Sequence, residues 1–412
     1  YNKLCQLKTL RAAWKVVQRS GLASQSEDTR HEVEEFASGV DIKLKSLLAD
    51  LRSEKFIFGP AKAIAVKKKG KNKKRQIVLA PIRNRIVQRA MLTTIQSLQP
   101  IKKILKAGHN FGGIDEGGVP KAIRAAYRAS KTNPYFIRSD IKGFFDNVPR
   151  EAAVRLLTDH FPGDQIFIEL FKNAVNVELD NLASLPEEER ELFPTDDTGV
   201  AQGSALSPLI CNVYLSTFDT ALNGRGIVCY RYIDDFIIFG PNRRKARAAL
   251  KSGLKILKEL GLEAYDPSTN PDKADEGLAS AGFGFLGCDI YSDRIVPNSK
   301  SRNRLKEKVD GIFRHSLKFS GYPAKTRPDK ISLAETLIRV SNIVRGWGNT
   351  YFFCNDDRVF DQLDTEVNEK VNTFVNRYYH RAAKLSANDL RRSLGVRLLS
   401  ERRRKPEFLR EN

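Results

Sequence analysis

YRYIDDFIIF, residues 230–239, sets two adjacent carboxylates, Asp234 and Asp235, between two apolar runs that favour β-strands. Successive strand residues point to opposite faces, so the two carboxylates serve one centre only if the chain reverses tightly there. We therefore expect a strand–turn–strand hairpin with an exposed acidic tip. A plain solvated turn is the alternative interpretation, but an acidic tip is also well suited to bind a hard cation such as Mg²⁺.

A second acidic strand is predicted at YFIRSDIKGFFD, residues 135–146, where an apolar run ends in Asp140 before a glycine and a polar turn. Proteins usually hold Mg²⁺ with one or two carboxylates, and substrate phosphates complete its coordination. Asp140 and the Asp234–Asp235 pair would supply carboxylates for two ions, which clamp the attacking and leaving oxygens of an in-line phosphoryl transfer. The predicted chemistry is nucleotidyl transfer.

Two further elements accompany these strands in the sequence. QGSALSPL, residues 202–209, is a glycine-bearing loop that opens an apolar helix through Leu222. GFGFLGC, residues 282–288, is a turn with spaced glycines and aromatic residues. Four elements in this order favour a catalytic site over a solvated turn, because a motif gains specificity from its context.

The four elements together resemble the palm of a reverse transcriptase. FIRSDIKGFFDNV (136–148) is similar to the first catalytic motif of that family, QGSALSPLICNVYL (202–215) to the second, and YRYIDDFIIF to its YxDD box. FGFLGCDI (283–290) resembles the primer-grip turn, which places Phe285, Leu286 and Gly287 in that role. The resemblance implies an α+β fold of right-hand polymerase type, with fingers, a palm of antiparallel sheet backed by helices, and a helical thumb.

The branch of the family is also indicated. KKRQIVLAPIRNRIVQ (73–88), DIKGFFDNV and RGWGNTYF (345–352) resemble the bacterial group II intron lineage, which includes maturases, retron enzymes and phage-defence enzymes. The similarity covers roughly residues 56–380. Maturases usually carry YADD, a QGG-type second motif and a GFRPGRS-like finger segment. This chain has YIDD, QGS and HNFGGIDEGG (109–118) instead, and these departures favour a defence enzyme.

The resemblance implies roles for individual residues. Asp140, Asp234 and Asp235, with the backbone of Ile141 nearby, would bind two Mg²⁺ ions, for which Mn²⁺ is a possible substitute. The implied nucleotide-binding residues are Lys74, Arg75, Phe145, Gln202, Gly203 and Lys273. Phe145 matches an aromatic steric gate that crowds a ribose 2′-OH and so favours dNTPs, although plain core packing is its alternative role. Lys273 resembles a lysine near the departing pyrophosphate, in a local context that deviates from the family.

Charge predicts the class of partner. The 412 residues carry 70 Lys and Arg against 49 Asp and Glu, a formal net charge of +21. Such an excess indicates a polyanion, because cationic side chains release counterions from a phosphate backbone. The expected partners are a structured non-coding or intron RNA, an RNA–DNA duplex and dNTPs, with no membrane, because every apolar run is too short to span a bilayer. The sequence does not indicate the oligomeric state.

The compartment is predicted from the cysteines and from the absence of a secretory signal. Five scattered cysteines with no CxxC pair favour reduced thiols in a bacterial cytoplasm, with neither disulfide nor zinc. The chain begins at Tyr1 instead of Met, which is compatible with missing leading residues. The five histidines are dispersed, and neither a P-loop nor an acidic cluster after the thumb is apparent, so the motifs argue against an HNH nuclease, a fused RNase H and an ATPase.

Four divisions of the chain are expected: an N-terminal helical extension (1–52), fingers (53–134), a palm (135–300) and a helical thumb with a basic tail (301–412). The apolar spacing of the extension predicts two helices, 3–18 and 28–51.

The patterns of residues 56–66 and 75–79 predict a finger hairpin whose basic tip, 67–74, contacts phosphate. Residues 178–197 carry eight acidic side chains and one basic one. We interpret them as an exposed connection that faces away from the duplex, and a mobile cover for the cleft in the absence of substrate is the alternative. Trp347 and Tyr351 are expected to pack in the thumb core.

The predicted function is RNA-directed DNA synthesis by a two-metal mechanism, on an associated non-coding RNA and in the service of phage defence. An intron-homing maturase with reverse transcriptase activity is the nearest alternative. An RNA-binding splicing cofactor, in which catalysis is secondary, is an alternative of a different class. Sequence leaves the template RNA and the priming group undetermined.

Overall fold

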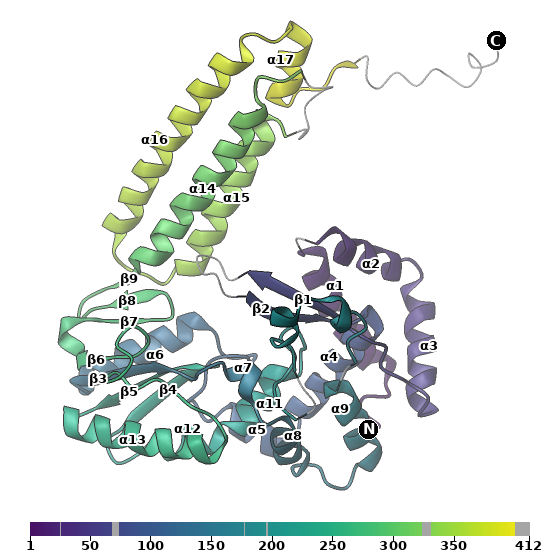
Figure 1. The fold of residues 1–412 in the computed structure, drawn as a ribbon, viewed down its shortest axis with the longest axis vertical. Coiled ribbons are helices and arrows are strands. Elements are labelled where there is room, and N and C mark those ends of the chain that lie inside the picture. Colours follow the sequence, from purple (N-terminus) through teal and green to yellow (C-terminus); the bar gives the residue numbers. More distant parts are fainter. Residues whose placement is uncertain (25, 68–73, 177, 195–196, 324–330, 400–412) are drawn as a thin grey trace. The chain divides into compact units, whose positions relative to one another are not determined.

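A computed structural model describes residues 1–24, 26–67, 74–176, 178–194, 197–323 and 331–399. Contacts between residues divide the chain into two compact units, Tyr1–Ser280 and Ala281–Asn412 (Figure 1). The domain limits expected from sequence remain predictions, since this division reports compactness and not functional parts.

Three helices begin the first unit, at Leu7–Leu22 (α1), Glu27–Ala37 (α2) and Val40–Arg52 (α3). The single helix expected over 28–51 is therefore wrong. Gly39 has a left-handed backbone with φ of 84°, a conformation that ends one helix and starts the next in a new direction. Apolar side chains such as Leu10, Trp14 and Leu47 are buried in the main core of this unit.

A β-hairpin follows and confirms the strand pair expected in the fingers. Strands β1 (Lys62–Lys67) and β2 (Lys74–Leu79) are antiparallel. Residues 68–73, where the basic tip was expected, lie outside the described residues. Three helices come next, at Ile82–Gln96 (α4), Gln99–Leu105 (α5) and Val119–Thr132 (α6).

A four-stranded sheet with the order β4-β5-β3-β6 forms the centre of the unit. Its strands are Tyr135–Asp140 (β3), Val228–Tyr232 (β4), Asp235–Gly240 (β5) and Asp275–Leu278 (β6). Helix α13 (Arg243–Glu259) packs against β3 and β5, and helix α6 packs against β4 and β5 (Figure 1). The other helices of the unit are Phe144–Asn147 (α7), Arg150–Thr158 (α8), Gln165–Val175 (α9), Glu187–Arg190 (α10), Ser207–Tyr214 (α11) and Ser216–Ala221 (α12), with a 3-10 turn at Leu182–Ser184 (η1). The strand expected near 262–265 contributes one isolated bridge, between Ile141 and Ala264.

The second unit joins a small sheet to a helical bundle. Strands β7 (Phe283–Phe285), β8 (Cys288–Ile290) and β9 (Ile295–Pro297) follow a 3-10 turn at Ala279–Ala281 (η2). The bundle consists of Ser299–Phe319 (α14), Leu333–Tyr351 (α15), Asp357–Ala382 (α16) and Ala387–Leu394 (α17), which confirms the expected helical composition. The expected basic tail lies mostly in residues 400–412, outside the described residues.

The bundle has its own apolar core, in which the rings of Phe313 and Phe374 stack at 4.3 Å. Trp347 packs at the edge of this core and donates its indole N–H to Ser301 Oγ at 3.3 Å. Tyr351 is hydrogen-bonded to the same hydroxyl at 2.6 Å, so both aromatic side chains have structural partners within the unit. No helix within the described ranges is long and apolar enough to cross a lipid bilayer. The architecture is α+β, as expected.

Candidate active site

Three aspartates lie at one end of the central sheet. Strand β3 pairs with β5 so that Asp140 stands directly opposite Asp235. Opposite residues of an antiparallel pair have side chains on the same face, with Cβ atoms about 5 Å apart. Asp234 precedes β5, and its carbonyl oxygen accepts a hydrogen bond from the Ile141 backbone N–H at 3.1 Å. The register of two strands thus gathers carboxylates that are more than ninety positions apart in the sequence.

The hairpin between β4 and β5 is closed by a two-residue turn, Ile233-Asp234, with Tyr232 paired to Asp235. Ile233 has φ of 62°, which is unfavourable for a β-branched residue. The tip was expected to be exposed, and this is wrong: Asp234 and Asp235 are only partly accessible. The loop of residues 109–113 runs beside the turn, and a Cβ on Gly112 would meet Ile233 Cγ1 at 2.6 Å.

The electrostatic environment of Asp140, Asp234 and Asp235 favours a bound cation. Burial, together with repulsion from Asp234 and Asp140, raises the pKa of Asp235 to about 7, against a smaller opposing effect of Arg138. Carboxylates held this close are stabilised by a positive charge between them. In the described part of the chain, no group of three or more His, Cys, Asp or Glu side chains is placed so that it could hold a metal ion.

A cavity of about 680 Å³ opens beside the aspartates. Eight of the residues predicted to form the site line it: Lys74, Arg75, Asp140, Ile141, Phe145, Gln202, Asp234 and Lys273. Asp235 and Gly203 lie next to lining residues in the sequence. Charged side chains and apolar ones such as Phe145 and Leu192 line the cavity together, and such a mixture suits a charged sugar-bearing ligand.

The acidic insert reaches this cavity, although we preferred to interpret it as a plain connection. Glu188, Glu189 and Leu192 line the cavity, and the Glu189 carboxylate forms an ion pair with the Lys74 ammonium group. Phe193 is buried against Ala63 and Val78 of the finger hairpin. Most of the described carboxylates of the segment are exposed, as expected, but apolar residues spaced among them anchor it to the fingers. Those apolar residues, in an otherwise acidic stretch, were the available signal.

The glycine loop at Gln202 is held by the finger hairpin. The Val78 N–H donates to the Gln202 carbonyl oxygen at 2.7 Å, and a Cβ on Gly203 would meet the Val78 carbonyl oxygen at the same distance. Asp146 Oδ1 accepts hydrogen bonds from the side chains of Gln76 at 3.0 Å and Gln202 at 3.3 Å. Asp146 therefore joins the fingers to the glycine loop, a role that the sequence did not indicate.

Phe144 and Phe145 are adjacent but differ in environment. Both residues line the cavity, but Phe144 is 2% exposed and belongs to the core, whereas Phe145 is partly accessible and packs at the edge of that core. Plain core packing therefore describes Phe144 better than Phe145.

Lys273 also lines the cavity, and its ammonium group lies 5.7 Å from the centre of the Tyr265 ring. The Tyr265 N–H donates to the Asp140 carbonyl oxygen at 3.2 Å.

The predicted primer-grip residues belong to the second unit. Phe285 ends β7 and pairs with Cys288 across a two-residue turn, Leu286-Gly287. Both turn residues have positive φ, 46° and 84°, as a tight hairpin of type I′ requires. The turn has the local geometry of a rigid hairpin tip, and its role stays a prediction.

Comparison with known proteins gives a family model described as reverse transcriptase (RNA-dependent DNA polymerase), which matches residues 66–290. The uncharacterized 91 kDa protein in the cob intron of Schizosaccharomyces pombe is 28% identical over 177 residues, which are 43% of this chain and 20% of that protein. The group II intron-encoded protein LtrA of Lactococcus lactis subsp. cremoris is 22% identical over 206 residues, 48% of this chain and 31% of LtrA. This chain thus corresponds to a minor part of either relative.

Among solved structures, apo telomerase from Candida tropicalis is similar to this chain at 15% sequence identity. The likeness covers 79% of this chain and 62% of the telomerase chain, with a TM-score of 0.42. A likeness of this degree carries no argument about the site of this chain.

Proposed function

Because the chain belongs to the reverse transcriptase (RNA-dependent DNA polymerase) family, we propose that it extends a primer with deoxynucleotides on an RNA template. The observation that carries the proposal is the register of β3 and β5, which sets Asp140 opposite Asp235 and beside the Ile233-Asp234 turn. Basic side chains and a glycine loop line the adjoining cavity. This combination suits a triphosphate that meets carboxylate-bound cations.

The proposed cofactor is a pair of Mg²⁺ ions, with Mn²⁺ as a substitute. Asp140, Asp234 and Asp235, with the backbone of Ile141, would hold them, since hard oxygen donors at the end of a sheet fit such ions. When bound, they supply charge neutralisation at the attacking and leaving oxygens. Three carboxylates are few ligands for two ions, and this number suits ions that also bind a triphosphate, whose oxygens would complete the coordination. The raised pKa of Asp235 agrees, as the three carboxylates repel one another.

The remaining cavity residues would position the nucleotide. Lys74 and Arg75 would attract the triphosphate, Gln202 and Gly203 would contact the base pair, and Lys273 would lie near the leaving pyrophosphate. Phe145 would exclude a ribose 2′-OH. In the second unit, Phe285, Leu286 and Gly287 would hold the primer, and the basic helices would follow the RNA–DNA duplex through its backbone, as heteroduplexes are commonly bound.

We propose further that the template is an associated non-coding RNA and that the DNA product serves phage defence in a bacterial cytoplasm. Three departures from the maturase pattern support this role: YIDD, QGS, and a finger segment without arginine. Intron mobility is the second candidate, and the likeness to LtrA and to the cob intron protein favours it. A splicing cofactor with secondary catalysis is the third.

Replacing Asp234 and Asp235 together by Ala is expected to separate these roles. DNA synthesis falls below detection, because the paired carboxylates that would hold the cations are gone. If the protein acts in defence, cells that carry the native locus lose phage protection together with DNA synthesis. Splicing of a candidate intron RNA should persist if RNA folding is the essential task. Full phage protection by the double variant would contradict the proposed defence mechanism.

The ion pair between Lys74 and Glu189 predicts opposite effects of two variants on nucleotide binding. Lys74→Ala is expected to raise the KM for dNTP about tenfold, since a triphosphate contact is lost at about 1.4 kcal/mol. Glu189→Gln is expected to lower the same KM, because the ammonium group is released from a competing carboxylate. Steady-state primer extension with a fixed template measures both. Glu187→Gln, an exposed neighbour on α10, serves as the matched control. Equal KM values for Glu189→Gln and wild type would exclude the competition.

A further inference from the structure

Arg231 is a charged residue in an interior position of the central sheet. It lies on β4, three residues before Asp234, and it is 0% exposed. It is also among the largest fully buried side chains in the described residues. Burying a guanidinium group is unfavourable unless its N–H groups are satisfied. The partners of Arg231 therefore show what the position contributes.

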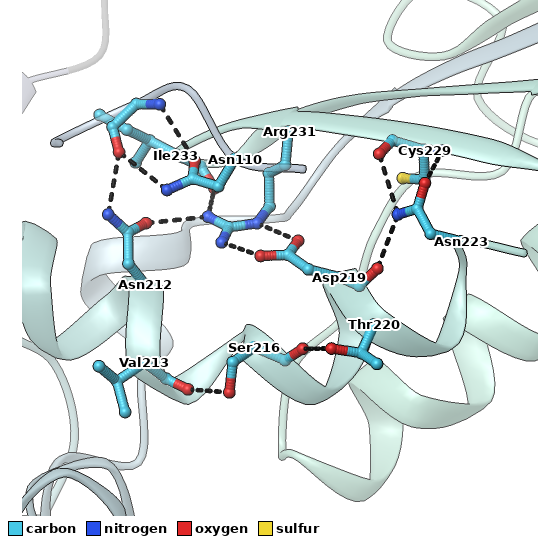
Figure 2. Close-up of polar contacts among 11 residues, drawn as sticks. Asn110, Asn212, Val213, Ser216, Asp219, Thr220, Asn223, Cys229, Arg231 and Ile233 are labelled. Atoms are coloured by element: carbon cyan, nitrogen blue, oxygen red, sulfur yellow. Dashed lines mark hydrogen bonds and ion pairs between the residues drawn. The ribbon is translucent and has the colours of Figure 1, made fainter. Parts of the chain in front are cut away.

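Figure 2 shows the guanidinium group at the centre of a network of hydrogen bonds. Nε and Nη2 donate to the two carboxylate oxygens of Asp219 on α12, at 2.7 and 2.5 Å. Nη1 donates to Asn212 Oδ1 on α11 at 3.1 Å and to the Ile233 carbonyl oxygen at 2.9 Å. One side chain thus joins two helices to the backbone of the turn that carries Asp234.

The same network holds the loop that covers the turn. The Asn212 side chain donates from Nδ2 to the Gly112 carbonyl oxygen at 2.9 Å, and Asn110 donates to the same oxygen at 3.1 Å. The backbone of Arg231 also pairs with this loop: its N–H donates to the His109 carbonyl oxygen at 2.8 Å, and its carbonyl oxygen accepts from Phe111 at 2.9 Å. Gly112 is therefore pressed against Ile233, where any side chain would collide.

The turn needs such support because its backbone is unfavourable. Ile233 has positive φ in a two-residue hairpin turn, at a place where glycine is usually preferred. A strained residue keeps its conformation only when the surrounding contacts impose it. The hydrogen bond from Arg231 to the Ile233 carbonyl oxygen acts on the peptide group that joins Ile233 to Asp234. The orientation of this peptide group determines the position from which the Asp234 side chain extends.

We propose that Arg231 is a positioning residue, which with Asp219 and Asn212 locks the Ile233-Asp234 turn in the conformation that brings Asp234 to Asp140. This inference rests on the proposed polymerase function for its kinetic consequence, and on the turn geometry alone for its structural one. Misplacement of a reacting group by about 1 Å can cost about 100-fold in rate. Groups that orient metal ligands typically contribute 10- to 100-fold to affinity or activity.

A merely structural role for the ion pair makes a different prediction. A buried pair can often be replaced by apolar residues of similar volume without loss of stability, whereas removal of one partner leaves a buried charge. Arg231→Met alone is therefore expected to lower Tm, and Arg231→Met with Asp219→Leu is expected to recover it. The turn would still lack the hydrogen bond to Ile233. Stability and positioning are separated in the double variant.

The experiment compares kcat, KM for dNTP, Tm and Mn²⁺ affinity in wild type and the double variant. We expect Tm to return to the wild-type range, kcat to stay about 100-fold lower, KM to change less than about threefold, and Mn²⁺ to bind about tenfold more weakly. Arg247→Met, which breaks a bidentate pair with Glu276 on β6, is the matched control and is expected to lower Tm while kcat stays near wild type. Recovery of both kcat and Mn²⁺ affinity along with Tm would overturn the proposal.

Two further measurements cover the remaining outcomes. If the double variant does not fold, Arg231→Lys replaces it in the experiment. This variant keeps a positive charge opposite Asp219 but lacks the several N–H donors of the guanidinium group. A folded Arg231→Lys protein with wild-type kcat would overturn the proposal. If the wild-type protein shows no polymerase activity, the proposed function is wrong. Hydrogen exchange then still tests whether Arg231 holds the Ile233-Asp234 turn in place. The amides of residues 232–236 are then expected to exchange at least about tenfold faster in the altered protein. Unchanged exchange there would exclude a positioning role.

Discussion

Asp235→Asn is expected to abolish DNA synthesis and yet to stabilise the folded protein in metal-free buffer at pH 8. Loss of a carboxylate that holds the cations removes about 4 kcal/mol of transition-state stabilisation, or about 10³-fold in kcat. The same change removes a charge that the fold disfavours, since burial and two neighbouring aspartates raise the pKa of Asp235 to about 7. We expect the free energy of unfolding to rise by up to about 4 kcal/mol, because a change of one in pKa corresponds to about 1.4 kcal/mol.

The pH dependence of this stabilisation follows from the direction of the shift. An aspartate with a raised pKa binds its proton more tightly in the folded state, so wild-type stability falls as pH increases from about 4, the unfolded pKa, to about 7. The advantage of Asp235→Asn should therefore be small at pH 4.5 and full at pH 8. Chemical denaturation in EDTA at both pH values measures it, and Mg²⁺ should reduce it by stabilising wild type alone. A variant less stable than wild type at pH 8 would contradict the electrostatic account.

Phe145→Ala is expected to weaken discrimination against ribonucleotides by about 100-fold. A pocket rejects a larger substrate by steric conflict, and removal of the ring admits the 2′-OH. The ratio of kcat/KM for dATP and ATP on one template is the measurement. The kcat/KM for dATP itself should change little, because Phe145 is expected to exclude the competitor more than it binds the substrate.

Phe144 supplies the matched control for this experiment. It is adjacent and aromatic, and although it borders the cavity, it is 2% exposed and packs in the core. Phe144→Leu should therefore lower Tm while leaving the nucleotide ratio near wild type. If Phe144→Leu and Phe145→Ala changed the ratio equally, a general loosening of the site would explain the result, and the steric role of Phe145 would be wrong.

The hairpin of β4 and β5 could be predicted from sequence because strong local signals agree there. Two apolar runs of strand length flank an Asp-Asp pair, and such a pattern fits a hairpin better than any helix. The α+β class and the helical second unit were also predictable, since strand signals cease near residue 300. The meeting of Asp140 with the Asp234–Asp235 pair was inferred from the carboxylates that Mg²⁺ needs, and the register of β3 and β5 brings Asp140 opposite Asp235.

Features that depend on distant contacts were not predictable. The helix expected over 28–51 is interrupted because Gly39 takes a left-handed backbone, which the apolar periodicity does not reveal. The acidic insert was interpreted from its charge alone, whereas its few apolar residues decide that it packs on the fingers. The loop at 109–113 was considered only for a missing arginine, and its contact with the Ile233-Asp234 turn depends on Gly112 and on Asn110, which accepts a hydrogen bond from the Gly112 N–H.

Arg231 illustrates the limit most clearly. In an alternating strand, its position faces inward, so an arginine there needs a buried partner. Asp219 lies in an apolar helix twelve residues earlier, and either residue alone reads as a surface charge. Only their pairing shows that both are interior and that the turn depends on them.

The central claim is that Asp140, Asp234 and Asp235 form one cation-dependent centre for RNA-templated DNA synthesis. Primer extension by the purified chain, on an RNA template with a DNA primer, dNTPs and Mg²⁺, tests it most directly when wild type is compared with Asp140→Asn. The account predicts full-length DNA with wild type, none in EDTA, and at least about 10³-fold less with Asp140→Asn. Equal extension by Asp140→Asn, or no extension by wild type on any primed RNA, would contradict it.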